Sequence, residues 1–244
     1  MRLKRKKSRP ITADAILVAD LHLTESTPVS RIDDYIEAQF SKLSFLEELR
    51  QQHSCSILCA GDIFDYWKSS PWLCLWISRK MPQMITIPGN HDLPMHSLSL
   101  YNKSALALVE EMGKVWVLKN PGNTIKTTNG LNVTGIPFGQ INDFEFPIGK
   151  RNGKKILLLH ELVWEKQVPS WASASLSAGH LLDQFGDSFD LILTGDNHQT
   201  FVVEKDGCVL VNPGSMMRIT ADQENHKPCC YLYYAESNEV HPVF

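Results

Sequence analysis

The sequence predicts an α/β fold in which two packed, mixed β-sheets are flanked by helices. Five short apolar runs recur along the chain, and continuous runs of this length are typical of strands buried on both faces. Helical patterns separate several of the runs, and strand hairpins occupy the C-terminal part, which favours layers of strands with helices outside. With 244 residues, of which 43% are hydrophobic, we expect one domain over residues 11–244 after a basic flexible arm over residues 1–10.

The elements follow from local patterns along the chain. The apolar runs predict buried strands at Ala15–Ala19, Ser56–Ala60, Met84–Ile87, Lys155–Leu159 and Asp190–Thr194. Apolar spacing predicts helices at 32–52, Pro71–Lys80 and Ser97–Met112. The first of these has an apolar stripe made of Ile32, Ile36, Phe40, Leu43, Leu46 and Leu49. Two dipeptides that favour tight turns, Asn129-Gly130 and Asp206-Gly207, predict hairpins, and Cys230–Tyr234 predicts a last strand.

Composition excludes several classes of protein. No run of about 18 apolar residues is present, which excludes a transmembrane helix. The apolar stretch after the basic N-terminus is interrupted by Asp14 and Asp20, so it does not resemble a secretory signal. Six cysteines without a CxxC pair indicate buried thiols in a reducing compartment. We therefore expect a cytoplasmic protein that does not bind a membrane.

Charge is distributed unevenly along the chain. The first ten residues carry six of the 24 basic residues and no acidic residue, which leaves 18 basic against 27 acidic residues in the body. Such an asymmetry often marks an anionic partner. A solvated, disordered tail without a partner explains it equally well.

Polar side chains of a catalytic or metal-binding kind follow each of the five predicted strands. They are Asp20 and His22 after the first strand, Asp62 and Asp65 after the second, Asn90, His91 and Asp92 after the third, His160 after the fourth, and Asp196, Asn197 and His198 after the fifth. Ligands of open α/β sheets bind at the carboxyl ends of the strands. A single such residue is more often structural, but five clusters in register predict one shared site.

The side-chain types indicate which metals this site would bind. Carboxylate, imidazole and amide donors without a thiolate favour hard divalent ions such as Mn²⁺, Mg²⁺ or Fe²⁺ over a structural zinc. Seven of these side chains are candidate ligands, which is too many for one ion and sufficient for two, the arrangement that promotes in-line displacement at phosphorus. They are Asp20, His22, Asp62, Asn90, His160, Asp196 and His198.

The motifs DxH, GDxxD, GNHD and a late GxxH resemble those of the calcineurin-like metallophosphoesterases, over roughly Ala15 to Ser215. The resemblance implies a four-layer sandwich and hydrolysis by a hydroxide that bridges two metals, with Mn²⁺ preferred. It implies that Asp20, His22 and His198 hold the first metal, that Asp62 bridges, and that Asn90 and His160 hold the second. His91 would protonate the leaving oxygen or stabilise its charge, and Asp65 would orient His91.

One position departs from the family pattern. The family usually has Gly-His-x-His at the late motif, whereas this chain has Gly195-Asp196-Asn197-His198. If Asp196 binds the second metal, the centre carries one more negative charge and acidifies its water less. The alternative is that Asp196 points elsewhere and the second site is weak.

Within the family, GDIFD and GNHDLP look most like the SbcD-type DNA-repair nucleases and their stand-alone phage relatives. This resemblance implies a phosphodiesterase that acts on DNA as an exonuclease. Candidate substrate contacts are Trp67 and Lys68 for stacking and charge, Ser215 in an NPGS turn like that of the superfamily's phosphodiesterases, and Arg218 just after it. The chain is too short for the segments that grip the ATPase partner of SbcD-type proteins, so we expect a stand-alone enzyme, with a homodimer left open.

Two alternatives remain at this stage. The chain is similar in length and motifs to UDP-diacylglucosamine pyrophosphohydrolases, but these typically have Gly-Asn-Arg-Asp where this chain has His91 as the third residue. Scaffold proteins with this fold, such as the retromer subunit, lack the catalytic histidine. The presence of His91 therefore favours an enzyme.

Overall fold

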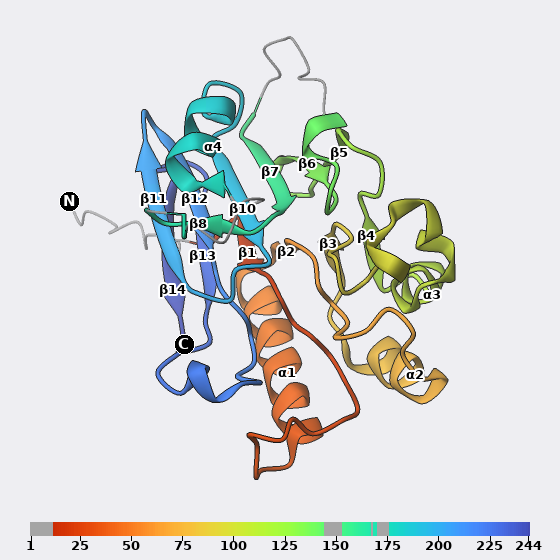
Figure 1. Cartoon of the computed structure of the whole chain (residues 1–244). Helices are drawn as coiled ribbons and strands as arrows, with labels where there is room; N and C mark the ends of the chain where they lie inside the picture. Colours follow the sequence, from red (N-terminus) through yellow and green to blue (C-terminus); the bar gives the residue numbers. More distant parts are fainter. Residues whose placement is uncertain (1–11, 144–152, 167, 170–175) are drawn as a thin grey trace, which may run out of the picture.

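The computed structural model describes residues 12–143, 153–166, 168–169 and 176–244, and its two main sheets each have six strands (Figure 1). The predicted arm over residues 1–10 lies outside the described residues. The first sheet has the spatial order β14 (Glu239–Val243), β13 (Cys230–Tyr234), β1 (Ala15–Val18), β2 (Ser56–Cys59), β3 (Met84–Thr86) and β4 (Val115–Val117). The second has the order β11 (Phe201–Lys205), β12 (Cys208–Asn212), β10 (Leu191–Gly195), β7 (Lys155–His160), β6 (Asn132–Ile136) and β5 (Asn123–Lys126).

Smaller elements complete the described chain. A short parallel pair is formed by β8 (Val163–Trp164) and β9 (Leu176–Ser177). Short 3-10 helices occur at Pro94–His96, Leu98–Lys103, Ile141–Asp143 and Ala221–Gln223. None of the described helices is long and apolar enough to cross a membrane.

The two sheets pack face to face and helices cover their outer faces. Leu58 of the first sheet and Leu158 of the second belong to one fully buried apolar cluster between the sheets. Three helices, α1 (Tyr35–His53), α2 (Pro71–Lys80) and α3 (Ala105–Glu111), share a second cluster with the first sheet, and α4 (Ala178–Phe185) shares a third with the second sheet (Figure 1). This four-layer arrangement confirms the predicted fold class.

Helix α1 differs from its predicted start. It begins at Tyr35, because the carboxylate of Asp34 accepts a hydrogen bond from the backbone N–H of Glu37 at 3.0 Å and caps the helix. Ile32 lies before this cap and is fully exposed, so its place in the predicted stripe was wrong. Gln39 is buried instead, and its amide bonds both the N–H and the C=O of Thr24 at 2.9 Å. Helix α1 therefore holds the loop that follows His22.

The predicted helix at 97–112 is wrong, whereas the prediction for Pro71–Lys80 is confirmed. Ser104 has extended backbone angles and interrupts the helical pattern. Its side chain accepts from the N–H of Ala107 at 3.1 Å, so Ser104 caps the shorter helix α3. A capping serine inside an apolar pattern thus replaced one long helix by a 3-10 helix at Leu98–Lys103 and a short α-helix.

Parallel pairing brings the polar ends of the strands to one edge. In the first sheet β1 pairs in parallel with β2, and β2 with β3. In the second sheet β7 pairs in parallel with β10. The loops after these strands therefore emerge at shared edges, where the predicted site residues lie.

Candidate metal centre

The loops after the strands bend sharply at the predicted ligands. Four predicted ligand positions have left-handed backbone angles, with φ of 51° at Asp20, 43° at His22, 52° at Asp62 and 75° at Asp196. Such angles are costly for residues other than glycine and cluster at functional sites. They turn the side chains of adjacent strands toward one another.

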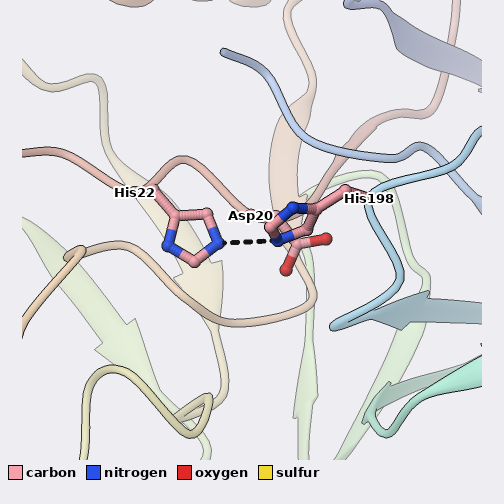
Figure 2. A group of neighbouring side chains, drawn as sticks. All are labelled: Asp20, His22 and His198. Atoms are coloured by element: carbon pink, nitrogen blue, oxygen red, sulfur yellow. Dashed lines mark hydrogen bonds between the residues drawn. The ribbon is translucent and has the colours of Figure 1, made fainter. Parts of the chain in front are cut away.

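The first group of possible ligands consists of Asp20, His22 and His198, whose ligand atoms lie within 4.8 Å of one another. Figure 2 shows the two imidazole rings turned toward each other beside the Asp20 carboxylate, with the Nε2 atoms of His22 and His198 3.0 Å apart. The Oδ1 atom of Asp20 accepts from the N–H of Asp196 at 3.0 Å. Its Oδ2 atom is buried and has no hydrogen-bond partner among the described residues. A buried carboxylate oxygen without a donor is what a cation would satisfy.

A second group contains Asp20, Asp62 and His160, again within 4.8 Å. The Oδ2 atom of Asp62 lies 3.4 Å from His160 Nε2 and 3.7 Å from His22 Nε2, so it lies between the two groups. The Nδ1 atom of His160 donates to the carbonyl of Ala60 at 2.5 Å. This bond fixes the ring so that Nε2 faces Asp62 and Asn90, and loss of the Nε2 proton would give a metal its lone pair.

Asn90 completes the second group. Its amide oxygen lies 3.0 Å from His160 Nε2 and 2.9 Å from Asp62 Oδ2. Two acceptor oxygens at this distance repel each other unless a cation lies between them. With the amide reversed, its N–H groups would donate to Asp62 instead. The orientation with the oxygen inward is the one that a bound ion would favour.

The electrostatics of the centre also fit a cation. Burial raises the pKa of Asp20 to about 7, with the nearby charge of Asp62 adding to the effect. Burial alone would raise the pKa of Asp62 too, but the charge and hydrogen bond of His160 hold it below its usual range. Burial and the charge of His22 lower the pKa of His198 to about 4, so this ring is neutral at pH 7 and keeps a lone pair. Divalent ions would compensate the crowded carboxylates.

Taken with the unpartnered oxygen of Asp20, these donors fit two divalent ions. All are nitrogen or oxygen atoms, as hard divalent metals require. Asp20 belongs to both groups, and Asp62 lies between them.

His91 lies against the centre and forms a third group of possible ligands with His22 and Asp65, whose ligand atoms also lie within 4.8 Å of one another. Its backbone N–H donates to Asp62 Oδ1 at 2.9 Å, and its ring packs edge-on against His22 with centroids 4.7 Å apart. The Nδ1 atom is 2.7 Å from the backbone carbonyl of Asp65, to which it donates. The Asp65 carboxylate lies 3.5 Å from His22 Nδ1 instead. Asp65 therefore orients His91 through the main chain and His22 through its side chain.

Asp196 is half-buried, and among the described residues it joins none of the three-residue ligand groups. Its backbone N–H binds Asp20, and its charge contributes to raising the pKa of His160. Asp196 follows Gly195, the last residue of β10. An added Cβ at Gly195 would lie 2.6 Å from the carbonyl of Ala60, so the absence of a side chain there lets the strand end approach the centre.

Sequence reasoning missed the role of Asp92. Its buried carboxylate accepts from the N–H groups of Ile63 at 3.3 Å, Phe64 at 3.0 Å and Gly89 at 3.1 Å. Burial raises its pKa to about 6, and the charge of Asp62 adds to this shift. Asp92 thus ties the loop after β2 to the loop after β3. The signal was its place at the end of the GNHD motif.

Asn212 has a similar role in the second sheet. Its Nδ2 atom donates to the carbonyls of Asn197 at 2.5 Å and Gln199 at 2.6 Å, and its Oδ1 accepts from Thr194 at 2.8 Å. The NPGS turn was recognised in the sequence, but its role in holding the loop that carries His198 was not.

Of the two predicted substrate contacts at the NPGS turn, Ser215 is buried and Arg218 is exposed. Ser215 is buried, donates to the carbonyl of Met217 at 2.8 Å and accepts from Gln223 at 2.9 Å. This burial argues for a bracing role in place of the predicted substrate contact. Arg218 is exposed and donates to the carbonyl of Glu224 at 3.2 Å.

The aromatic stretch that follows Asp65 is accessible. The rings of Tyr66 and Trp67 have centroids 5.5 Å apart, Tyr66 is exposed and Trp67 half-buried. Lys68 is exposed beside them. Stacking surface and positive charge therefore lie directly after a residue that contacts His22 and His91.

The model of the calcineurin-like phosphoesterase superfamily domain matches residues 14–236. No curated protein matches the sequence significantly. The fold is similar to that of the protein TT1561 from Thermus thermophilus, with a TM-score of 0.57 and 12% identity over 95% of this chain and 98% of that one.

Two other solved structures are similar at the level of the fold. A phosphopantetheinyl hydrolase from Mycobacterium tuberculosis has a TM-score of 0.56 and 14% identity over 96% of both chains. A putative 5'-nucleotidase from Staphylococcus aureus, in complex with alpha-ketoglutarate, has a TM-score of 0.52 and 14% identity, with 94% of this chain covering 52% of that one.

Proposed function

The chain belongs to the calcineurin-like phosphoesterase superfamily and is a metal-dependent phosphoesterase. Within this class, we propose that it hydrolyses phosphodiester bonds in DNA. One observation carries the proposal: Asp62 Oδ2 lies between two groups of buried ligands, with His91 held against both. An arrangement of this kind suits in-line displacement at a phosphorus atom.

Each group of side chains has a part in the proposed reaction. Asp20, His22, Asp62 and His198 would hold one divalent ion, and Asn90 and His160 would complete a second site with Asp62. When bound, such ions polarise phosphoryl oxygens and lower the pKa of a water ligand. We favour Mn²⁺, with Mg²⁺ and Fe²⁺ as alternatives, because the donors are carboxylate, amide and imidazole.

His91 is the proposed proton donor. Its Nδ1–H is committed to the carbonyl of Asp65, which fixes the ring and leaves Nε2 to hold the proton that the leaving oxygen takes up. The edge-on contact with His22 keeps the ring beside the ligands.

Two features support DNA as the substrate. Tyr66, Trp67 and Lys68 offer stacking and positive charge next to the centre, and unpaired bases stack on such side chains. The six basic residues among the first ten offer phosphate contacts, which supply most sequence-independent affinity for nucleic acid. Since the body is acidic, this arm would offset its repulsion.

The proposal is tested with metal-free purified protein to which Mn²⁺, Mg²⁺, Fe²⁺ or Zn²⁺ is added. The substrates are bis-p-nitrophenyl phosphate, the matching monoester, and single- and double-stranded DNA. We expect Mn²⁺ to give the highest rate, the diester to exceed the monoester, and DNA to be cleaved. Activity that survives thorough chelation, or a strong preference for the monoester, contradicts the proposal. Diester hydrolysis without DNA cleavage returns support to a small substrate such as a nucleoside diphosphate sugar.

A variant pair tests the aromatic stretch separately. Trp67→Ala should raise KM for single-stranded DNA by roughly tenfold if a base stacks on it. Trp116→Ala is the matched control, because Trp116 is an exposed tryptophan on β4, a strand that contributes no ligand. Equal increases in KM for both variants would show that Trp67 does not stack on substrate.

A further inference from the structure

A cavity of about 590 Å³ opens between the edges of the two sheets, at the opposite ends of the strands from the metal centre. We propose that this cavity binds an organic anion with an apolar tail and one negative charge, the chemistry of a medium-chain carboxylate. The inference goes beyond the proposed function and does not depend on the substrate of the metal centre. It assigns to the chain a binding site remote from the metals.

The lining residues place the cavity at the amino ends of β2 and β3. Ser56 and Met84, the first residues of these strands, line it together with Arg50 from the last turn of α1. The ligands of the metal centre follow the carboxyl ends of the same strands. A strand rises about 3.3 Å per residue, so the length of β2 alone puts roughly 13 Å between the two sites. The cavity is therefore separate from the catalytic centre.

The side chain of Trp116 lies on the inter-sheet face of β4. Neighbouring side chains of a strand point to opposite faces. Val115 and Val117 belong to the cluster between the first sheet and its helices, which places Trp116 on the other face. Its register partner on β3, Ile85, belongs to the cluster between the sheets and shares that face. The backbone thus directs this indole toward the space between the sheets.

Trp116 is left largely uncovered at the margin of the sandwich. β4 and β5 are the outermost strands of their sheets, and Ile125 of β5 packs only partly buried against the inter-sheet cluster. Trp116 is 59% exposed, and within the described part of the chain it has no ring contact and no hydrogen-bond partner. Its indole is therefore available to a ligand, together with Ile85 and Ile125, which also line the cavity.

The charges at the cavity favour an anion. Arg50 and Lys126 line it, and none of its described lining residues is acidic, although acidic residues outnumber basic ones in the whole chain. The guanidinium of Arg50 donates to Glu47 at 2.7 and 2.8 Å. Lys126 is exposed and has no ion pair with any described residue. Its ammonium, a point charge on a flexible four-carbon stem, suits a head group with one negative charge.

The walls favour an apolar tail over a polar ligand such as a nucleotide. Trp116, Ile85 and Ile125 offer indole and hydrocarbon surface, against which burial of CH₂ groups is favourable. A nucleobase among these three side chains would lose hydrogen bonds to water without gaining polar partners. The cavity volume lies within the range of about 300–1,000 Å³ that is typical of small-molecule sites. A tail between the sheets with its carboxylate at Lys126 fits both the walls and the charge.

A series of carboxylates tests the inference by isothermal titration calorimetry on the full-length, metal-loaded protein. Acetate, hexanoate, octanoate and decanoate share one head group and differ in tail length. We expect each added CH₂ between hexanoate and decanoate to tighten binding roughly fourfold. Decylamine, which has the opposite charge, should bind roughly tenfold more weakly than decanoate. An affinity that is independent of tail length, or equal affinities for decylamine and decanoate, overturns the inference.

Lys126→Glu reverses the charge at the rim of the cavity. We expect it to weaken decanoate binding and to strengthen decylamine binding, each by roughly fivefold, because an exposed ion pair is weak. Lys103→Glu is the matched control, since Lys103 is an exposed lysine at the end of the 3-10 helix Leu98–Lys103 and does not line the cavity. Opposite changes for two ligands with matched tails cannot come from partial unfolding.

Trp116→Ala removes one wall of the cavity. Decanoate binding should weaken roughly tenfold, and Trp116→Phe should recover most of it. Hydrolysis of bis-p-nitrophenyl phosphate and the thermal midpoint without ligand are measured in parallel, and we expect hydrolysis to stay unchanged because the cavity lies away from the metals. Decanoate that inhibits this hydrolysis and keeps its affinity in both Trp116→Ala and Lys126→Glu is bound at the metals, and the inference is then wrong.

Two other occupants of the cavity give different results. If residues 1–9 covered it, their deletion would tighten decanoate binding. If a second copy of the chain covered it, decanoate would dissociate a dimer in analytical ultracentrifugation. Either result overturns the inference, whereas an unchanged affinity after the deletion and an unchanged mass on addition of decanoate support it.

Discussion

Replacement of Gly89 by alanine tests most directly how the centre is built. A Cβ added at Gly89 would lie 2.1 Å from Asp62 Oδ1 and 2.5 Å from the backbone nitrogen of Asp62. To reach an ordinary contact, the two loops must separate by about 1.3 Å. That shift displaces the Asp62 carboxylate, which lies between the two ligand groups. A misplacement of about 1 Å can cost about 10²-fold in rate. We expect this loss in kcat/KM, with about 1–3 kcal/mol lost from the free energy of unfolding.

The assay combines hydrolysis of bis-p-nitrophenyl phosphate, metal content and thermal unfolding with and without chelator. Gly179→Ala is the matched control, because Gly179 lies in α4 and an added Cβ would meet no atom within 4 Å. Alanine there should stabilise the helix by about 1 kcal/mol without affecting activity. A Gly89→Ala protein with normal metal content and normal rates would refute the close packing of these loops.

Four further predictions follow from the site. His91→Ala should lower kcat by about 10²–10⁴ while both metals stay bound, and loss of metal together with activity would make His91 a ligand. Asp196→Ala should lose the second metal selectively, whereas full occupancy and unchanged kinetics would limit Asp196 to its backbone bond with Asp20. Chelation should lower the thermal midpoint, because a metal at 100 times its Kd adds about 2.7 kcal/mol of stability; an unchanged midpoint would contradict metal binding. Deletion of residues 1–9 should reduce the salt slope of DNA binding by about 1–3 and spare hydrolysis of a small diester, and equal slopes would refute a role for the arm.

Local patterns in the sequence were sufficient to predict most strands and the place of the site. The run at Cys230–Tyr234 and the helix at Pro71–Lys80 have the predicted bounds, because apolar spacing and a proline at the first turn act over a few residues. The Asp206-Gly207 turn has φ of 52° and 82°, the angles that a tight hairpin requires of these residue types. Polar residues after parallel strands meet because such strands end at one edge.

Other features depended on which residues meet across long separations in the chain. Asp92 and Ser215 look like exposed motif residues in the sequence, and only the packed loops turn them inward as acceptors and braces. An aspartate or serine has the same hydrogen-bonding capacity whether it is exposed or buried, so its partners can be identified only once the sheets are assembled.

The sequence by itself determined the types of the ligands and their order along the chain, since these are properties of the residues. Tertiary structure decided how the ligands are grouped, with Asp20 in one group with His198 and in another with His160. The physical reason is that a side chain's donors and acceptors are set by its covalent structure, whereas their convergence depends on strand order and on strained turns that a packed core must stabilise.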